Sequence, residues 1–115
     1  MKLAIIGSRE IENADIGGNL PDGVEEIVSG GAAGVDRLAA VYAREKGIPL
    51  TEFLPDYGRY GRGAPLRRNA EIAAYADGVL AFWDGRSRGT AHALALFRAA
   101  GKPTLVILAE TGAHR

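Results

Sequence analysis

The chain has 115 residues, of which 47% are apolar and 24% charged, a balance typical of a globular domain. It contains no cysteine, which excludes disulfides, thiolate metal sites and a thiol nucleophile, and its two histidines are too few for a multi-histidine metal site. No apolar run is long enough to span a bilayer, and the first residues do not resemble a signal peptide. We therefore expect a cytoplasmic protein with no membrane partner.

The net charge is zero, but the charges are unevenly distributed along the chain. Residues 1–56 carry five basic and ten acidic side chains, whereas residues 57–115 carry nine basic and four acidic ones. A neutral protein lacks the broad basic surface typical of nucleic-acid binders, so nucleic acid is not the expected partner. Four arginines without an intervening acid follow Tyr57, namely Arg59, Arg62, Arg67 and Arg68. This cluster fits a small anion, or it is a solvated polar loop.

Five short apolar runs mark the predicted strands. They begin, in chain order, at Leu3, Ile27, Ile48, Val79 and Thr104. Continuous apolar runs of this length are typical of strands that are buried on both faces, and therefore of a parallel sheet.

Segments with helical periodicity lie between these runs. Residues 35–46 place apolar side chains at helical spacing, and Gly47 then ends the helix. A second helix is predicted to begin around Pro65, because proline suits the first helical turn. A third covers residues 90–100, while residues 10–21 allow only a short helix.

This alternation predicts a single α/β domain over residues 1–109. Its five-stranded parallel sheet would be doubly wound, with right-handed crossovers and helices on both faces. The usual strand order, 3-2-1-4-5, makes strands two, one and four neighbours, so that the loops at their carboxyl ends face one crevice. Residues 110–115 lack periodicity and are expected to form a frayed tail.

Three segments rich in glycine and hydroxyl groups follow the strands that should meet at this crevice. Glycine lets backbone N–H groups approach a ligand, a following helix presents free N–H groups to an anion, and arginine adds a planar fork for phosphate oxygens. Neither the Gly-x-Gly-x-x-Gly fingerprint nor a Gly-Lys-Ser/Thr P-loop is present. The residues predicted to bind a phosphate-bearing ligand are Gly7, Ser8, Arg9, Ser29, Gly30, Gly31, Gly34, Asp36, Asp84, Ser87, Gly89 and Thr90.

Two charged residues of these loops have alternative roles. Arg9 would reach a phosphate, or it would pair with Asp36. Asp36 lies in the first turn of a predicted helix, where the helix dipole favours a carboxylate, or it contacts a ribose hydroxyl. Because a carboxylate repels phosphate, we expect it to point aside or to pair with an arginine.

The aromatic residues near the crevice also have alternatives. Tyr57 and Tyr60 would stack on a base or cover a sheet edge, and Trp83 would pack in the core or stack on a base. His92 would be a partly exposed histidine or a proton carrier.

Three segments resemble the SLOG superfamily, which is named after the DNA-processing protein A and the LOG cytokinin-activating enzymes. They are residues 5–9, 28–36 and 82–90, and the resemblance extends over most of residues 2–108, with a small stand-alone bacterial branch as the nearest match. The resemblance implies a Rossmann-like fold and a site for nucleotides or their derivatives, such as nucleoside monophosphates or molecules related to NAD and ADP-ribose. The family usually has an Arg-Asn pair in the helix after Pro65, which implies roles for Arg68 and Asn69. Adjacent helical residues diverge by about 100°, so at most one of Arg67 and Arg68 should face the crevice.

The function predicted from these residues and this resemblance is binding of a nucleotide-like ligand for sensing or delivery, with no other cofactor and no metal. One alternative is a LOG-like phosphoribohydrolase, which is disfavoured because Ala93 stands where those enzymes carry a glutamate in Gly-Gly-x-Gly-Thr-x-x-Glu. Another is single-stranded nucleic-acid binding, disfavoured by the zero net charge and by the absence of the extra domains of the DNA-processing relatives.

A homodimer is also expected. The relatives often pair through helices, and Ile72 and Tyr75 lie off the helix face formed by Leu66, Ala70 and Ala73. Apolar residues on a second side of this helix would be buried by a second copy.

Overall fold

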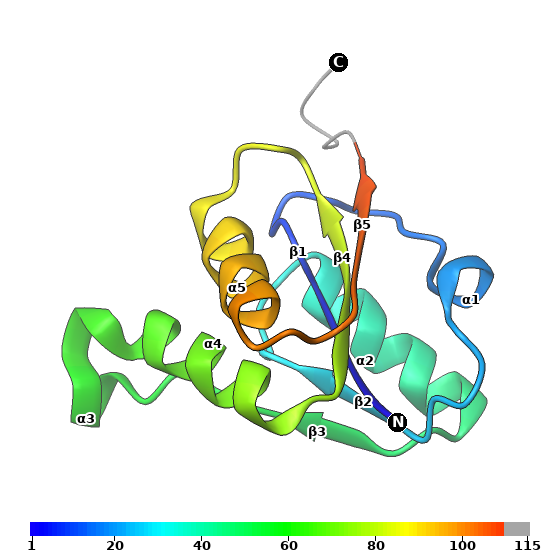
Figure 1. Ribbon diagram of the computed structural model, residues 1–115, viewed down its shortest axis with the longest axis horizontal. Coiled ribbons are helices and arrows are strands. Elements are labelled where there is room, and N and C mark those ends of the chain that lie inside the picture. Colours follow the sequence, from blue (N-terminus) through cyan, green and yellow to red (C-terminus); the bar gives the residue numbers. More distant parts are fainter. Residues whose placement is uncertain (110–115) are drawn as a thin grey trace.

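The computed structural model describes residues 1–109, so the expected tail at 110–115 lies outside the described residues. The elements in chain order are β1 (Lys2–Gly7), α1 (Ile16–Asn19), β2 (Glu26–Ser29), α2 (Val35–Lys46), β3 (Leu50–Glu52), α3 (Tyr57–Tyr60), the 3₁₀ turn η1 (Gly61–Gly63), α4 (Ala64–Tyr75), β4 (Gly78–Trp83), α5 (Arg88–Ala99) and β5 (Thr104–Leu108) (Figure 1).

The five strands form one parallel sheet in the order β3-β2-β1-β4-β5. The predicted fold class and strand order are therefore confirmed. Helices α1 and α2 lie on one face of the sheet, and α4 and α5 lie on the other (Figure 1). No helix in residues 1–109 is both long and apolar enough to cross a membrane.

The central strand β1 contributes side chains to both faces of the sheet. Ala4 and Ile6 pack in a buried cluster with residues of α4 and α5. Leu3 and Ile5 pack in a second cluster with residues of α2 and with Ile16 of α1. Two buried faces explain why the strand reads as an unbroken apolar run, since successive residues point to opposite faces.

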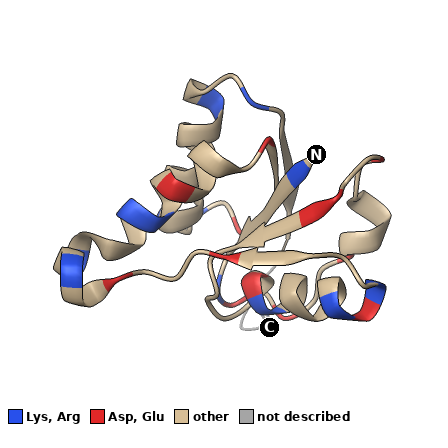
Figure 2. Cartoon of the chain, turned by 90° about the horizontal axis from the view of Figure 1, so that it is seen from below, with Lys and Arg blue, Asp and Glu red and all other residues tan. Residues whose placement is uncertain are grey.

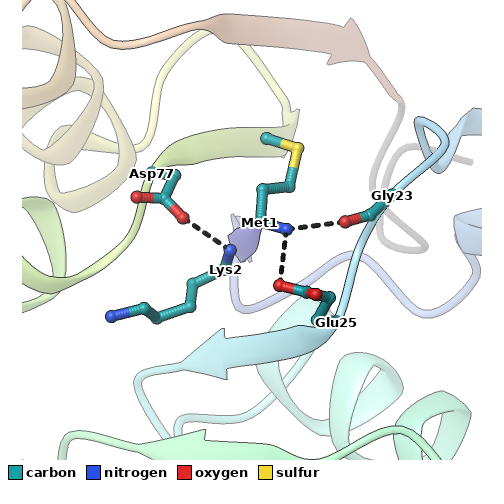
Figure 3. Close-up of polar contacts among 5 residues, drawn as sticks. All are labelled: Met1, Lys2, Gly23, Glu25 and Asp77. Carbon is teal, nitrogen blue, oxygen red and sulfur yellow. Dashed lines mark hydrogen bonds and ion pairs between the residues drawn. The ribbon is translucent and has the colours of Figure 1, made fainter.

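Polar contacts join β1 to its surroundings at the amino end of the sheet (Figure 3). The amino group of Met1 donates to the carbonyl oxygen of Gly23 at 2.6 Å and pairs with the Glu25 carboxylate at 3.2 Å. The backbone N–H of Lys2 donates to Asp77, just after α4, at 2.8 Å, and this bond lowers the pKa of the Asp77 carboxyl. The start of β1 is thereby tied to the chain on both sides.

A second polar cluster joins α4 to the sheet. The carboxylate of Glu26 accepts hydrogen bonds from the hydroxyls of Tyr75, at 2.6 Å, and Thr51, at 2.7 Å. These bonds hold the pKa of Glu26 below its usual value, and the bond to Glu26 raises the pKa of Tyr75. The Tyr75 ring also packs against Phe53 and lies under the Lys2 ammonium.

Helix α4 buries only part of the face formed by Leu66, Ala70 and Ala73. Ala73 is buried, together with Asn69 and Ile72, whereas Leu66 and Ala70 are exposed. Ile72 is therefore a core residue of this chain, and Tyr75 is engaged with Glu26. The two residues that suggested a helix-mediated homodimer are covered within the chain itself.

The segment before α4 also differs from the prediction. A solvated polar loop was one alternative for the arginine-rich segment after Tyr57, but residues 57–63 form α3 and the turn η1. Helix α3 begins at a cap, because the Asp56 carboxylate accepts a hydrogen bond from the N–H of Arg59 at 3.1 Å. Helix α3 lies beyond the N-terminal end of α4, away from the sheet (Figure 1).

Candidate functional site

A cleft of about 380 Å³ opens at the carboxyl edge of the sheet. It lies between the loops after β1, β2 and β3, the first half of α4 and the start of α5. Most of the predicted site residues line it, namely Gly7, Arg9, Gly30, Gly31, Asp36, Arg68, Asn69, Ser87, Gly89 and Thr90. Four do not, namely Ser8, Ser29, Gly34 and Asp84.

Ser8 and Asp84 hold the loops after β1 and β4 together beneath the cleft. The buried Ser8 hydroxyl accepts a hydrogen bond from the backbone N–H of Asp84 at 3.1 Å. The Asp84 carboxylate accepts from the backbone N–H groups of Arg86 and Ser87, both at 2.8 Å, and these bonds lower its pKa. Both side chains therefore shape the loops.

Ser29 and Gly34 have comparable roles in the loop after β2. The buried Ser29 hydroxyl accepts from the N–H of Gly31 at 3.3 Å. Gly34 has a φ of 73°, and a Cβ there would lie 2.4 Å from the carbonyl oxygen of Arg9. Only glycine fits this close approach between the first two glycine-rich loops.

Asp36 is the acidic residue among those lining the cleft, and only 7% of it is exposed. Its carboxylate accepts a hydrogen bond from the N–H of Ala32 at 3.1 Å. Burial raises the pKa of the Asp36 carboxyl, against the opposing effects of that hydrogen bond and of the nearby Arg68 guanidinium. Because the N–H groups of Gly31 and Ala32 already have partners within the loop, this loop offers fewer free donors to an anion than its sequence suggests.

Arg68 and Asn69 reach from α4 to two of the glycine-rich segments. Arg68 Nη1 donates to the carbonyl oxygen of Gly30, and Arg68 Nε donates to Asn69 Oδ1 at 3.2 Å. Asn69 Nδ2 donates to the carbonyl oxygen of Gly89 at 3.2 Å and lies 3.3 Å from His92 Nδ1. These contacts set the separation between the loop after β2 and the start of α5.

The neighbouring Arg67 points to another side of α4. Its guanidinium lies 5.0 Å from the centre of the Tyr60 ring, and Arg59 lies 5.3 Å from the same ring. Basic positions continue from α4 onto α3 (Figure 2), and neither Arg59 nor Arg67 lines the cleft. Of the two adjacent arginines, Arg68 lines the cleft and Arg67 does not.

Arg9 is exposed and lines the cleft. Within residues 1–109 its guanidinium forms neither an ion pair nor a hydrogen bond, so the alternative of pairing with Asp36 does not occur there. At the start of α5 the N–H of Ser87 is bonded to Asp84, whereas the first helical N–H groups have no intrahelical partner. The cleft therefore combines a guanidinium group that has no partner within residues 1–109 with the N-terminus of α5, whose first N–H groups have no intrahelical partner.

Part of the cleft lining was not identified from the sequence. The residues missed are Pro55, Pro65 and Leu66, which line the cleft together with Tyr57, and Leu66 is 50% exposed. Their signal was ambiguous, because an apolar residue at the start of a helix resembles a core residue in sequence. Trp83 does not line the cleft; its ring packs against the core and its Nε1–H donates to the Ser87 carbonyl at 3.0 Å.

Comparisons with known proteins find two similarities. Residues 19–60 match the model of the family described as "YspA, cpYpsA-related SLOG family". The chain is also 39% identical, over 85 residues, to the Gene 61 protein of Mycobacterium phage D29; the match covers 69% of this chain and 68% of that protein. No solved structure matches the chain.

In the described part of the chain, no three His, Asp or Glu side chains gather in a group that could hold a metal ion.

Proposed function

Since this chain belongs to the SLOG superfamily, we propose that its cleft binds a nucleotide or a nucleotide-derived ligand that carries a phosphate. The family suggests a nucleotide-related role, and the cleft supplies a place for such a ligand. The observation that carries the proposal is the arrangement of Arg9 and the free end of α5 around one cleft at the carboxyl edge of the sheet.

The phosphate would bind between Arg9 and the first turn of α5. Unpartnered N–H groups and the helix dipole both favour an anion there. The side chains of Ser87 and Thr90, whose hydroxyl oxygens are 3.3 Å apart, add donors at the same place. Arg68 contributes positive charge from α4 while it stays bonded to Gly30. The Asp36 carboxylate is oriented by its hydrogen bond from the N–H of Ala32. It can accept a further hydrogen bond from a ribose hydroxyl of the ligand.

The ligand class is a nucleoside monophosphate or a molecule related to NAD or ADP-ribose. The cleft volume of about 380 Å³ lies within the range of small-molecule sites. The side chain at the position of the LOG glutamate, Ala93, lines the cleft and supplies no carboxylate. We therefore propose a sensor or carrier, and we expect nucleoside monophosphates to be recovered intact after incubation with the protein.

Replacing Arg9 with alanine tests the site. Because Arg9 is exposed and has no polar partner within the described chain, Arg9→Ala should leave the melting temperature of the unliganded protein nearly unchanged. A charge-assisted hydrogen bond contributes about 1.5–3 kcal/mol, so the affinity for AMP or ADP-ribose should fall by roughly 10- to 150-fold. Titration calorimetry measures the affinity, and a thermal-shift assay measures the stability.

Arg98→Ala is the matched control, because Arg98 is exposed near the opposite end of α5 and does not line the cleft. This variant should bind as the wild type does. The proposal fails if no phosphate-bearing nucleotide binds the wild type, or if Arg9→Ala and Arg98→Ala weaken binding equally.

A further inference from the structure

We propose that Tyr57 is a stacking platform for the nucleobase of the ligand. This inference rests on the proposed function, since it assigns a second part of the same ligand to the apolar side of the same cleft. It thereby selects ligands that carry a base over ligands that carry only a sugar phosphate.

The residues that line the cleft include two chemically different groups from different chain segments. Arg9, Ser87 and Thr90, from the loop after β1 and the start of α5, provide donors and are here called the polar side. Pro55, Tyr57, Pro65 and Leu66, from the segment between β3 and the first turn of α4, provide a hydrocarbon and aromatic surface and are called the apolar side. A nucleotide has the same division, because its phosphate is charged and its base presents an apolar π-face. A ligand that filled the cleft with its phosphate at α5 would place its base against the apolar side.

The environment of Tyr57 differs from that of every other tyrosine in the chain. Tyr42 packs against the buried cluster that includes Val35 and Ala39 of α2, Tyr60 lies near the guanidinium groups of Arg59 and Arg67, and Tyr75 is bonded to Glu26. Tyr57 is 60% exposed, and within residues 1–109 its side chain has neither a hydrogen bond nor an aromatic or cation–π partner. An aromatic ring that lines a cleft without covering any core is suited to contact a ligand.

The backbone around Tyr57 is held in place without help from its ring. Asp56 caps α3 through the N–H of Arg59, and the N–H of Tyr60 donates to the carbonyl oxygen of Asp56 at 2.9 Å. Helix α3 connects through η1 directly to α4, which carries Arg68 and Asn69. The backbone of Tyr57 is therefore held in a defined place along the chain segment that leads to Arg68 and Asn69 before any ligand binds.

The experiment compares ligands with and without a base. Binding of AMP, ADP-ribose and ribose 5-phosphate is measured by titration calorimetry on the full chain and on Tyr57→Ala, Tyr57→Phe and Tyr60→Ala. Stacking of a base on an aromatic ring contributes enough that Tyr57→Ala should weaken AMP and ADP-ribose by roughly 5- to 150-fold. The affinity for ribose 5-phosphate should not change. Tyr57→Phe keeps the ring and should bind as the wild type does.

Tyr60→Ala is the matched control, because Tyr60 lies on the same short helix but does not line the cleft. It should leave all three affinities unchanged. The inference is overturned if Tyr57→Ala weakens ribose 5-phosphate as much as AMP, or if it weakens neither. In both cases binding to the wild type would still support the proposed function, whereas a wild type that binds none of the three ligands would refute both proposals.

Discussion

Asp36 is a carboxylate whose burial in the wall of the cleft opposes its own ionisation. Its pKa is raised from the ordinary value of 3.8, chiefly because the charged form is desolvated. A carboxyl group with a raised pKa in the folded state favours folding below the pKa it has when unfolded, and this contribution is lost as the pH rises through the folded pKa. At neutral pH the charged Asp36 carboxylate therefore lowers the free energy of unfolding.

We expect Asp36→Asn to raise the melting temperature at pH 7, because an amide oxygen can still accept the bond from Ala32 without carrying a buried charge. The melting temperatures of variant and wild type should converge as the pH is lowered toward 4. Thermal unfolding measured between pH 4 and 8 gives both quantities. An equal pH dependence in the two proteins would contradict the burial argument.

Asp84 provides a control of opposite sign. Hydrogen bonds from Arg86 and Ser87 lower its pKa, so its contribution to stability is present above the ordinary value of 3.8 and is lost as the pH falls through the folded pKa. We expect Asp84→Asn to lower the melting temperature at pH 7, since a neutral amide accepts these bonds less strongly than a carboxylate does.

At the scale of elements, α4 connects the cleft to the core, and Lys102 secures its far end. The Lys102 ammonium donates to the carbonyl oxygens of Ala73, Ala74 and Ala76 at 2.6, 3.2 and 2.7 Å. These carbonyls are left without partners where a helix ends, and a cation there also interacts favourably with the helix dipole.

Lys102→Met keeps most of the hydrocarbon stem and removes these bonds. We expect a loss of about 1–2 kcal/mol in the free energy of unfolding. Chemical denaturation measures this loss. Because Lys102 does not line the cleft, ligand affinity should be unchanged under conditions where the variant is folded. Wild-type stability in Lys102→Met would show that the carbonyls are equally well satisfied by water.

At the scale of the whole molecule, the edge strand β5 is the most exposed apolar part of the sheet. Leu105 is 47% and Leu108 72% exposed, and one side of β5 has no neighbouring strand among residues 1–109. Edge strands with exposed apolar side chains are prone to pair with another chain.

We therefore expect homodimerisation through β5 rather than through Ile72 and Tyr75 of α4. Light scattering at micromolar concentration should give the mass of a dimer, and Leu108→Lys should give that of a monomer. A monomeric wild type would contradict this expectation. A dimer that persists in Leu108→Lys would place the interface elsewhere.

The overall fold could be predicted because its signals are local. An unbroken apolar run such as 79–83 indicates a strand buried on both faces, and Gly47 marks a helix end by its own backbone preference. The alternation of such segments then restricts the topology to few arrangements. Local signals were weaker at 57–63, where glycines suggested a loop but the Asp56 cap and short-range hydrogen bonds produce α3 and η1.

The sequence by itself determined which segments are strands, in what order they pair, and that glycine-rich segments meet at one edge of the sheet. Only the tertiary structure decided what each residue does at that edge. Ser8 and Asp84 bond to each other although they are far apart in the chain, and Arg68 lines the cleft and reaches from α4 to the carbonyl oxygen of Gly30 in the loop after β2. The Tyr57 side chain is exposed because no other element of the described chain packs over it. Such roles depend on distances between segments remote in sequence, which packing sets and local residue patterns do not encode.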